Sequence, residues 1–231
     1  DVPGYISLIA DERYADAVKL IRKDNPFVTS CALVCEHPCE TKCRRNFVDD
    51  AVNIRGLKRY AADHCGLVPP PECCEPTGKT IAIIGGGPSG LSAAYYLQQM
   101  GHQCTVFEHR KELGGMLYYG IPNYRLPKER LAEDVQNILA TGVETKMNAC
   151  IGDGDGEISF KMLKENYDAV YISIGAHTDK KLGIPGEDAK GVISAIQMLR
   201  DIGDGNPPDF TGKNVIVVGG GNVAMDATRS A

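Results

Sequence analysis

The sequence predicts an α/β fold in which a helical, cysteine-rich first part precedes a parallel sheet of the nucleotide-binding kind. From Lys79 onward, apolar segments of strand type alternate with helical segments, an order that produces parallel sheets. Apolar runs at residues 80–84 and 214–218 each lead into a glycine motif, Gly-x-Gly-x-x-Gly in the first case and Gly-x-Gly-x-x-Ala in the second. Such a motif between a strand and a helix indicates a dinucleotide site. Two of them in one chain indicate two nucleotides held side by side.

Length, composition and charge limit the functional classes. The chain has 231 residues, which suggests one or two domains, and its 43% hydrophobic content suffices for a buried core. The net charge is −5 and no basic run stands out, so no nucleic acid is expected as a partner. No apolar stretch reaches the ~18 residues of a membrane-spanning helix, and the start has no secretory pattern. We therefore expect a cytoplasmic protein without membrane insertion. Both ends look cut, as in a fragment of a longer polypeptide.

Two helices are expected before the sheet. Residues 11–25 carry an apolar stripe with helical spacing, with Asp11 as the N-cap and an Asn-Pro pair as the stop. Asn53 can cap a second helix over residues 54–65. The stretch 66–78 contains four prolines and two glycines, so we interpret it as a linker between domains.

Cysteines are concentrated in the first part of the chain. Seven of the nine precede residue 75, and Cys31, Cys35, Cys39 and Cys43 follow one another at four-residue intervals. An iron–sulfur cluster, a zinc site and inert thiols are the three interpretations. Zinc usually takes Cys-x2-Cys pairs, whereas iron–sulfur clusters accept varied spacings, so the cluster is favoured. A proline at position 38 argues against one continuous helix through the four cysteines. The cysteines predicted not to be ligands are Cys65, Cys73 and Cys74.

The first glycine motif explains the strand, turn and helix around it. Gly85 permits the sharp turn after the strand, Gly87 lets the backbone approach a pyrophosphate, and Gly90 lets the following helix pack closely. Free N–H groups and the positive end of that helix then face the phosphates. The next strand ends at Glu108, where an acid can accept hydrogen bonds from a ribose diol.

The remaining elements continue the alternation. A Gly-Gly pair at 114–115 indicates a loop in which the backbone approaches a ligand closely. The charged residues 128–130 are interpreted as a solvated helix start without a function. In chain order we expect a helix at 91–101, a strand at 104–107, a helix from Pro127 to about Gly142, strands at 143–147 and 169–174, a turn at 183–188, a short strand and a helix within 191–202, a linker at 202–212 and a strand at 214–218.

Several long stretches resemble one family of redox proteins. They are DNPF, CALVCEHPCETKC, VNIRGLKRYAAD, IAIIGGGPSGLSAAYYL, ELGGMLYYGIPNYRLPKE, DAVYISIGAHTDKKLGIPGED and VIVVGGGNVAMDA. The family includes the small subunit of bacterial glutamate synthase, the amino-terminal half of dihydropyrimidine dehydrogenase and the large subunit of NADH-dependent ferredoxin:NADP oxidoreductase. The resemblance implies a helical iron–sulfur domain, then a Rossmann-like FAD domain and the start of an inserted NAD(P)-binding Rossmann domain. The boundaries we expect are 1–65 for the iron–sulfur domain, 66–78 for the linker, 79–202 for the FAD domain and 203–231 for the start of the NAD(P) domain.

The resemblance also implies which residues bind the nucleotides. The residues that match FAD contacts are Gly85, Gly87, Pro88, Ser89, Gly90, Glu108, Gly115, Met116, Leu117, Arg125 and Ile151. The residues that match phosphate contacts of NADH or NADPH are Gly219, Gly221, Asn222, Val223 and Ala224. Each side chain has a plainer alternative. Met116 and Leu117 can be core residues, Arg125 can form a surface ion pair, and Glu108 can be a solvated acid.

For the cysteines, the resemblance implies ligands of two [4Fe-4S] clusters. Cys43 matches a ligand of one cluster, and Cys35 and Cys39 match ligands of the other. Cys31 matches a position that is usually not a ligand. Lys58 stands where the family often has a Gln or Glu ligand, so either the second cluster is absent or Cys31 substitutes for that ligand.

The expected function is an NAD(P)H-dependent FAD and iron–sulfur oxidoreductase. A nicotinamide delivers a hydride to the flavin, which exchanges single electrons with the clusters. No acid or base side chain is required for the hydride step, so no catalytic residue is predicted. The expected partners are other subunits of a redox complex or a ferredoxin-like acceptor. The alternatives are a non-catalytic electron-conduit or docking subunit and a zinc-binding scaffold.

Overall fold

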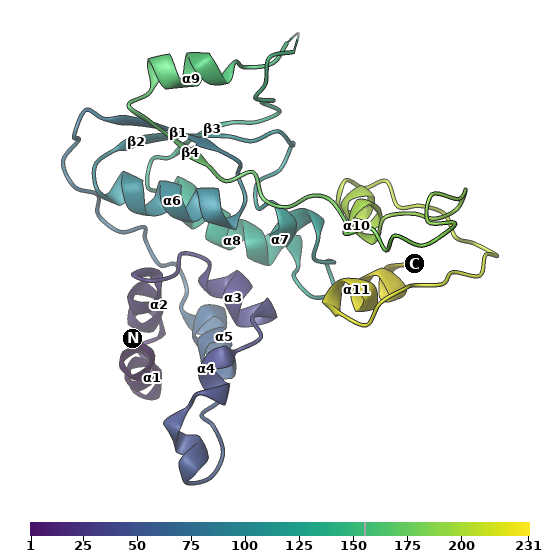
Figure 1. Cartoon of the computed structure of the whole chain (residues 1–231). Helices are drawn as coiled ribbons and strands as arrows, with labels where there is room; N and C mark the ends of the chain where they lie inside the picture. Colours follow the sequence, from purple (N-terminus) through teal and green to yellow (C-terminus); the bar gives the residue numbers. More distant parts are fainter. Residues whose placement is uncertain (155) are drawn as a thin grey trace.

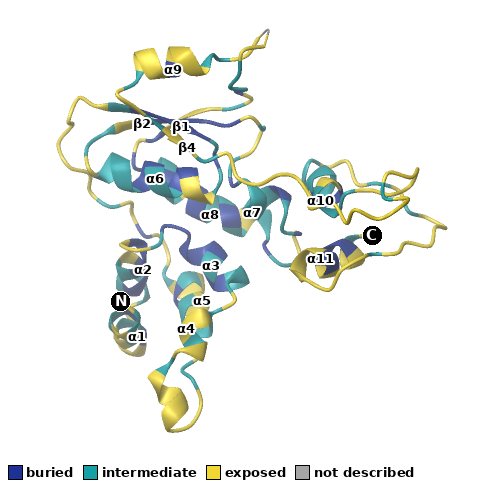
Figure 2. Cartoon of the chain, in the orientation of Figure 1, coloured by how far each residue is buried: buried dark blue, intermediate teal, exposed yellow. Residues whose placement is uncertain are grey.

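The computed structural model describes residues 1–154 and 156–231 and arranges them in three parts (Figure 1). A group of helices forms the first part, and a four-stranded parallel sheet with helices on both faces forms the second. The third part, residues 176–231, is a lobe beside helix α7 (Met116–Tyr119) that contains two helices and long extended segments. Buried residues concentrate in the first two parts, and the lobe is mostly exposed (Figure 2).

The first part contains more helices than expected. They are α1 (Val2–Ala10), α2 (Tyr14–Arg22), α3 (Val28–Val34), α4 (Pro38–Thr41), the 3-10 helix η1 (Arg44–Phe47) and α5 (Ile54–His64). The predicted Asn53 cap is confirmed, because its side chain accepts a hydrogen bond from the Gly56 N–H at 2.9 Å. The predicted Asp11 cap is wrong. The residue before α2 is Arg13, and Asp11 instead ends the unpredicted helix α1.

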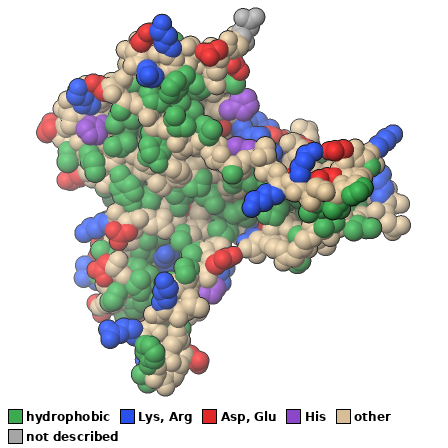
Figure 3. Space-filling view, viewed as in Figure 1, with side chains coloured by type: hydrophobic (Ala, Val, Ile, Leu, Met, Phe, Trp, Pro, Cys, Tyr) green, Lys and Arg blue, Asp and Glu red, His purple; other side chains and the backbone are tan. Residues whose placement is uncertain are grey.

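The interruption predicted within the cysteine-rich stretch is confirmed. Helix α3 ends at Val34 and α4 begins at Pro38, with His37 in the left-handed region at φ 46° between them. Beyond α4, residues 43–52 form an arm with Phe47 and Val48 at 90% and 80% exposure (Figure 3).

The sheet follows the predicted alternation. Its strands are β1 (Thr80–Ile84), β2 (Gln103–Phe107), β3 (Glu144–Lys146) and β4 (Ala169–Ile172), all parallel in the order β3-β2-β1-β4. Helices α6 (Pro88–Gln99) and α8 (Lys128–Leu139) cover one face, and α9 (Phe160–Asn166) lies over the other. The central strands β1 and β2 are apolar and buried because they are covered on both faces.

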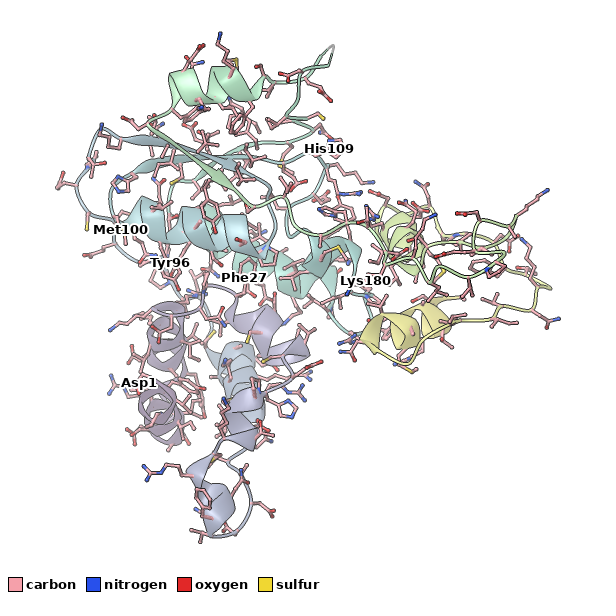
Figure 4. The ribbon with its side chains drawn as sticks, in the orientation of Figure 1. Asp1, Phe27, Tyr96, Met100, His109 and Lys180 are labelled. Atoms are coloured by element: carbon pink, nitrogen blue, oxygen red, sulfur yellow. The ribbon has the colours of Figure 1, made fainter. Side chains whose placement is uncertain are left out.

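An apolar contact joins the first part to the sheet. Phe27 is buried among Leu91, Tyr95 and Leu131 of helices α6 and α8. Figure 4 labels Phe27 and Tyr96 at this junction. Because these side chains come from both parts, the cysteine-bearing helices pack directly on the layer that carries the glycine turn.

Two expectations about the lobe are wrong. Residues 214–218 do not form a strand, and Ile216 and Val218 are 88% and 72% exposed. A strand needs a neighbour that accepts its backbone hydrogen bonds, and no strand in the described part of the chain lies beside this segment. The short strand expected before α10 (Ala195–Gly203) is likewise missing from the described residues, although the helix itself is confirmed.

One ion pair at the amino end of β4 makes stability depend on pH. Asp168 accepts hydrogen bonds from Lys79 Nζ at 2.8 Å and the Thr80 N–H at 2.9 Å, which lowers its pKa to about 2. The folded pKa is below the unfolded value of about 3.9, so the carboxylate adds stability above pH ~4 and loses it as pH falls toward 2. We expect Asp168→Asn to flatten this acid limb in urea unfolding measured from pH 6 to pH 2. The control is Asp50→Asn, at an exposed acid without an ion pair among the described residues; an equal effect there would contradict the assignment.

Candidate functional site

The glycine turn after β1 shows which glycines the protein itself requires. Gly85 has φ +106°, and a Cβ there would lie 2.4 Å from the Ser173 carbonyl oxygen. A Cβ on Gly90 would lie 2.0 Å from the Gly85 carbonyl oxygen. Gly87 differs, because its backbone is extended and the nearest atom to a Cβ there is 3.8 Å away. The space beside Gly87 is therefore left open by the protein.

The start of α6 is free to bind an anion. Pro88 is the first residue of this helix, and no side chain caps the preceding Gly87. The first N–H groups of a helix have no partner within it and carry partial positive charge. At α6 they face a cavity of 670 Å³ at the carboxyl ends of β1, β2 and β4.

The cavity brings together many of the predicted contacts. The predicted residues that line it are Gly85, Gly87, Pro88, Ser89, Glu108, Gly115, Met116 and Ile151. Other lining residues were not predicted. They include His109, Arg110, Tyr119, Cys150, Ser173, Ile174, Gly175, His177 and Arg200. His109 follows the end of β2 (Figure 4). The sequence could have indicated Ser173 to Gly175 as lining residues, because they directly follow strand β4 just as Gly85 directly follows strand β1.

Glu108 is held inside the turn. It is 7% exposed, so the interpretation as a solvated acid is wrong. Its carboxylate accepts hydrogen bonds from the Gly86 N–H at 2.6 Å and the Arg110 N–H at 2.8 Å. Each carboxylate oxygen keeps a second acceptor position. Glu108 can therefore accept a ligand hydroxyl while it braces the glycine turn.

The loop from Gly114 to Lys128 forms one wall. Met116 lines the cavity, whereas Leu117 lies outside it and packs on a core cluster that contains Leu126 and Leu131. The interpretation of Lys128 as solvated is wrong. Its Nζ is partly buried and donates hydrogen bonds to the carbonyls of Tyr118 and Ile121, and burial lowers the pKa of its ammonium. Lys128 thus fixes the shape of this loop.

Arg125 does not line the cavity. Its guanidinium forms an ion pair with Asp226 at 2.5 Å, on helix α11 (Asn222–Ser230). This arrangement agrees with the ion-pair alternative, although the pair is half-buried rather than on the open surface.

The second glycine motif forms a helix start without its strand. Gly221 precedes α11 with no side-chain cap, and Gly219 has φ +130°. Ala224 is buried, and Val223 is 47% exposed. The Asn222 side chain donates a hydrogen bond to Glu36 at 2.8 Å, so this motif lies beside the cysteine-rich loop.

The four clustered cysteines lie on and after α3. Cys31 is within α3, and its backbone carbonyl accepts a hydrogen bond from the Cys35 N–H at 3.1 Å. The Cys35 sulfur accepts a hydrogen bond from the His37 N–H at 3.3 Å, and Lys58 Nζ lies 3.7 Å from the Cys31 sulfur. N–H donors aimed at sulfur suit thiolate ligands of an iron–sulfur cluster.

The cluster ligand set is only partly assembled. Within residues 1–154 and 156–231, no three cysteine, histidine or carboxylate side chains are grouped so that they could hold a metal ion. Among the described residues, the structure therefore does not place three of Cys31, Cys35, Cys39 and Cys43 together as metal ligands.

Comparison with known families divides the chain in two. Residues 79–231 match the pyridine nucleotide-disulphide oxidoreductase family. Residues 1–67 match dihydropyrimidine dehydrogenase domain II, which is described by its 4Fe-4S cluster. None of the helices that the structure describes is long and apolar enough to cross a membrane.

Similar proteins are parts of redox enzymes. The chain is 40% identical to NADP(+)-dependent formate dehydrogenase subunit beta of Moorella thermoacetica, over its whole length and 36% of that protein. It is 42% identical to NADPH-Fe(3+) oxidoreductase subunit beta of Geobacter sulfurreducens, covering 35% of it. It is 35% identical to the glutamate synthase [NADPH] small chain of Bacillus subtilis, covering 48% of it. The chain thus spans about a third to a half of these relatives.

A solved structure also resembles the fold. FprA of Mycobacterium tuberculosis in complex with NADPH aligns with a TM-score of 0.58 and 27% identity, over 65% of this chain and 36% of FprA. The comparisons confirm the predicted resemblance, the α/β fold class, the oxidoreductase class and the pairing of FAD and NAD(P)H with a [4Fe-4S] domain. Two of these relatives are named as beta subunits.

Proposed function

The chain belongs to the pyridine nucleotide-disulphide oxidoreductase family, and from this we propose that it passes electrons from NADPH or NADH through FAD to [4Fe-4S] clusters. The observation that carries the proposal is the 670 Å³ cavity at the glycine turn, next to a loop that contacts the second glycine motif's helix. A pocket of this size is typical of small-molecule and cofactor sites.

The residues that would hold FAD have distinct tasks. The open space at Gly87 and the uncapped start of α6 suit a pyrophosphate. Glu108 would accept hydrogen bonds from ribose hydroxyls, and Gly115 and Met116 would form the wall beside the ring system. When bound, FAD supplies the conversion between hydride transfer and single-electron transfer. The protein's part is to bind, orient and exclude water, so no catalytic side chain is assigned.

The other predicted contacts belong to the same proposal. Gly219, Gly221 and the first turn of α11 would bind the phosphates of the nicotinamide nucleotide. Cys35, Cys39 and Cys43 would bind iron, with Cys31 as a further ligand because Lys58 faces it and cannot itself replace a Gln or Glu ligand. We place the domain limits at 1–65, 79–202 and 203–231, with 66–78 as the linker.

We also propose that the acceptor is a partner subunit or a ferredoxin-like protein and that the site of action is the cytoplasm. The names of the relatives support the subunit assignment. All nine cysteines are free, which supports a reducing compartment.

Anaerobic titration of the full-length holoprotein with NADPH and NADH tests the proposal. The expected result is bleaching of the flavin absorbance by at least one nucleotide, followed by a cluster signal in electron paramagnetic resonance. Iron and sulfide analysis establishes the cluster content independently. A flavin that neither nucleotide bleaches would refute the reductase function and favour a conduit subunit, and zinc in place of iron would refute the electron path.

A further inference from the structure

A single buried carboxylate ties helix α11 to the loop after α7. Asp226 is 5% exposed and accepts hydrogen bonds from Arg125 Nη1 at 2.5 Å and from the Tyr124 hydroxyl at 3.1 Å. One turn later, the Arg229 guanidinium lies over the Tyr124 ring at 4.1 Å. Two side chains of α11 therefore converge on two adjacent residues of the loop.

These contacts connect the two glycine motifs. Asp226 lies one turn inside the helix that begins directly after Gly219 to Gly221. In the loop, Arg125 follows the segment in which the backbone carbonyls of Tyr118 and Ile121 accept hydrogen bonds from Lys128. That segment continues from α7, whose Met116 and Tyr119 line the cavity. A short chain of fixed contacts thus runs from the second motif to the wall of the cavity.

Two other contacts bear on the position of α11, and α10, which makes the first of them, also contacts α7. Ala227 of α11 packs on Met198 and Leu199 of α10, and Asn222 makes one exposed hydrogen bond to Glu36. Exposed polar contacts contribute little, whereas a buried carboxylate strongly requires its partner. Asp226 is therefore the buried polar contact that ties α11 directly to the loop, beside the apolar contact of α11 with α10.

We propose that Arg125 and Asp226 form a positioning pair that holds the nicotinamide-binding helix against the flavin loop. The inference rests on the proposed function, because it concerns the distance that a hydride must cross. Misplacement of reactants by about 1 Å can cost on the order of 100-fold in rate. A helix tied to the flavin loop by one buried ion pair makes that distance sensitive to the loss of the pair.

Rapid anaerobic mixing with saturating NADPH tests this pair in the full-length holoprotein. Asp226→Asn keeps the shape of the side chain, and Arg125→Met removes the charge on the other side. We expect each variant to slow flavin bleaching roughly tenfold, and the double variant to be no slower than the slower single variant. Arg125→Lys should recover part of the rate. Flavin content and reduction by dithionite should stay unchanged.

Arg130→Met is the matched control. Arg130 forms an Arg–Asp contact of the same length, 2.5 Å, with Asp63 on α5, and its other ion-pair partner, Glu133, is on α8, so its ion pairs do not involve either glycine motif. Bleaching at the wild-type rate in the Arg125 and Asp226 variants, or multiplied effects in the double variant, would overturn the inference.

Amide hydrogen exchange over residues 222–230 provides a readout that does not depend on activity. It should rise in both single variants and not in Arg130→Met. Unchanged exchange would overturn the positioning pair even if the reductase function holds. A wild-type protein that NADPH and NADH both fail to bleach would instead refute the proposed function.

Discussion

Replacing Gly87 with alanine is expected to weaken FAD binding strongly and leave the fold intact. A Cβ at this position meets no protein atom closer than 3.8 Å, and its backbone is one that any residue adopts. The methyl group would instead occupy the space where a pyrophosphate must approach the backbone. We expect the affinity for FAD to fall about 100-fold, on the order of 3 kcal/mol. Flavin fluorescence titration of the apoprotein measures the affinity, and thermal unfolding of the apoprotein measures the fold.

Gly90→Ala provides the opposite case in the same turn. Its Cβ would lie 2.0 Å from the Gly85 carbonyl oxygen and 2.7 Å from Ser173 Oγ, so strand and helix must separate. Overpacking of this kind costs about 1–3 kcal/mol or more, and we expect the apoprotein itself to be destabilised. If Gly87→Ala were as unstable as Gly90→Ala, or if it kept its flavin, the assignment of the open space to a pyrophosphate would be wrong.

Local rules were sufficient to predict the turn at the heart of the site. A sharp turn between a strand and a helix needs a residue that tolerates positive φ, and Gly85 has φ +106°. Close packing of the helix on the strand needs a residue without a side chain, and Gly90 lies against the Gly85 carbonyl. Both requirements depend only on neighbouring residues within the motif, so they can be predicted from the sequence alone.

Contacts between distant segments could not be predicted in the same way. Residues 214–218 have a strand-like composition, but strand formation depends on a neighbour rather than on the segment itself. In the sequence, Lys128 resembles any charged residue at a helix start. In the structure, its ammonium donates hydrogen bonds to the loop carbonyls of Tyr118 and Ile121. Ser173 became part of the cavity wall because β4 lies beside β1, and the order of strands was not predicted.

Asp134 is the clearest example of a distant contact, and its removal is expected to have a large effect on stability. It lies on α8 with 1% exposure, and its carboxylate accepts hydrogen bonds from the N–H groups of Thr29 at 3.1 Å and Ser30 at 2.7 Å. These N–H groups belong to the first turn of α3, where no partner exists within the helix and Phe27 supplies no side-chain cap. Asp134 therefore caps α3 from more than 100 residues away.

We expect Asp134→Ala to lower the free energy of unfolding by about 3 kcal/mol, because it leaves two buried N–H groups without an acceptor. Urea unfolding of the holoprotein measures this loss. Ser30→Ala is the control, since the Ser30 side chain is buried at the same junction and its backbone N–H is retained. An equal loss in both variants would show that packing at this junction, and not the cap, provides the stability.

The same change is expected to slow electron transfer between the two halves of the site. Helix α3 carries Cys31 and leads directly to Cys35, whereas α8 packs beneath the loop that walls the cavity. The carboxylate of Asp134 thus joins the segment proposed to hold the cluster to the segment proposed to hold the flavin. In Asp134→Ala, the rate of flavin bleaching by NADPH should be close to that of the wild type, while the cluster signal after it appears more slowly. A variant in which both steps slow equally would place the role of Asp134 in the general stability of the fold.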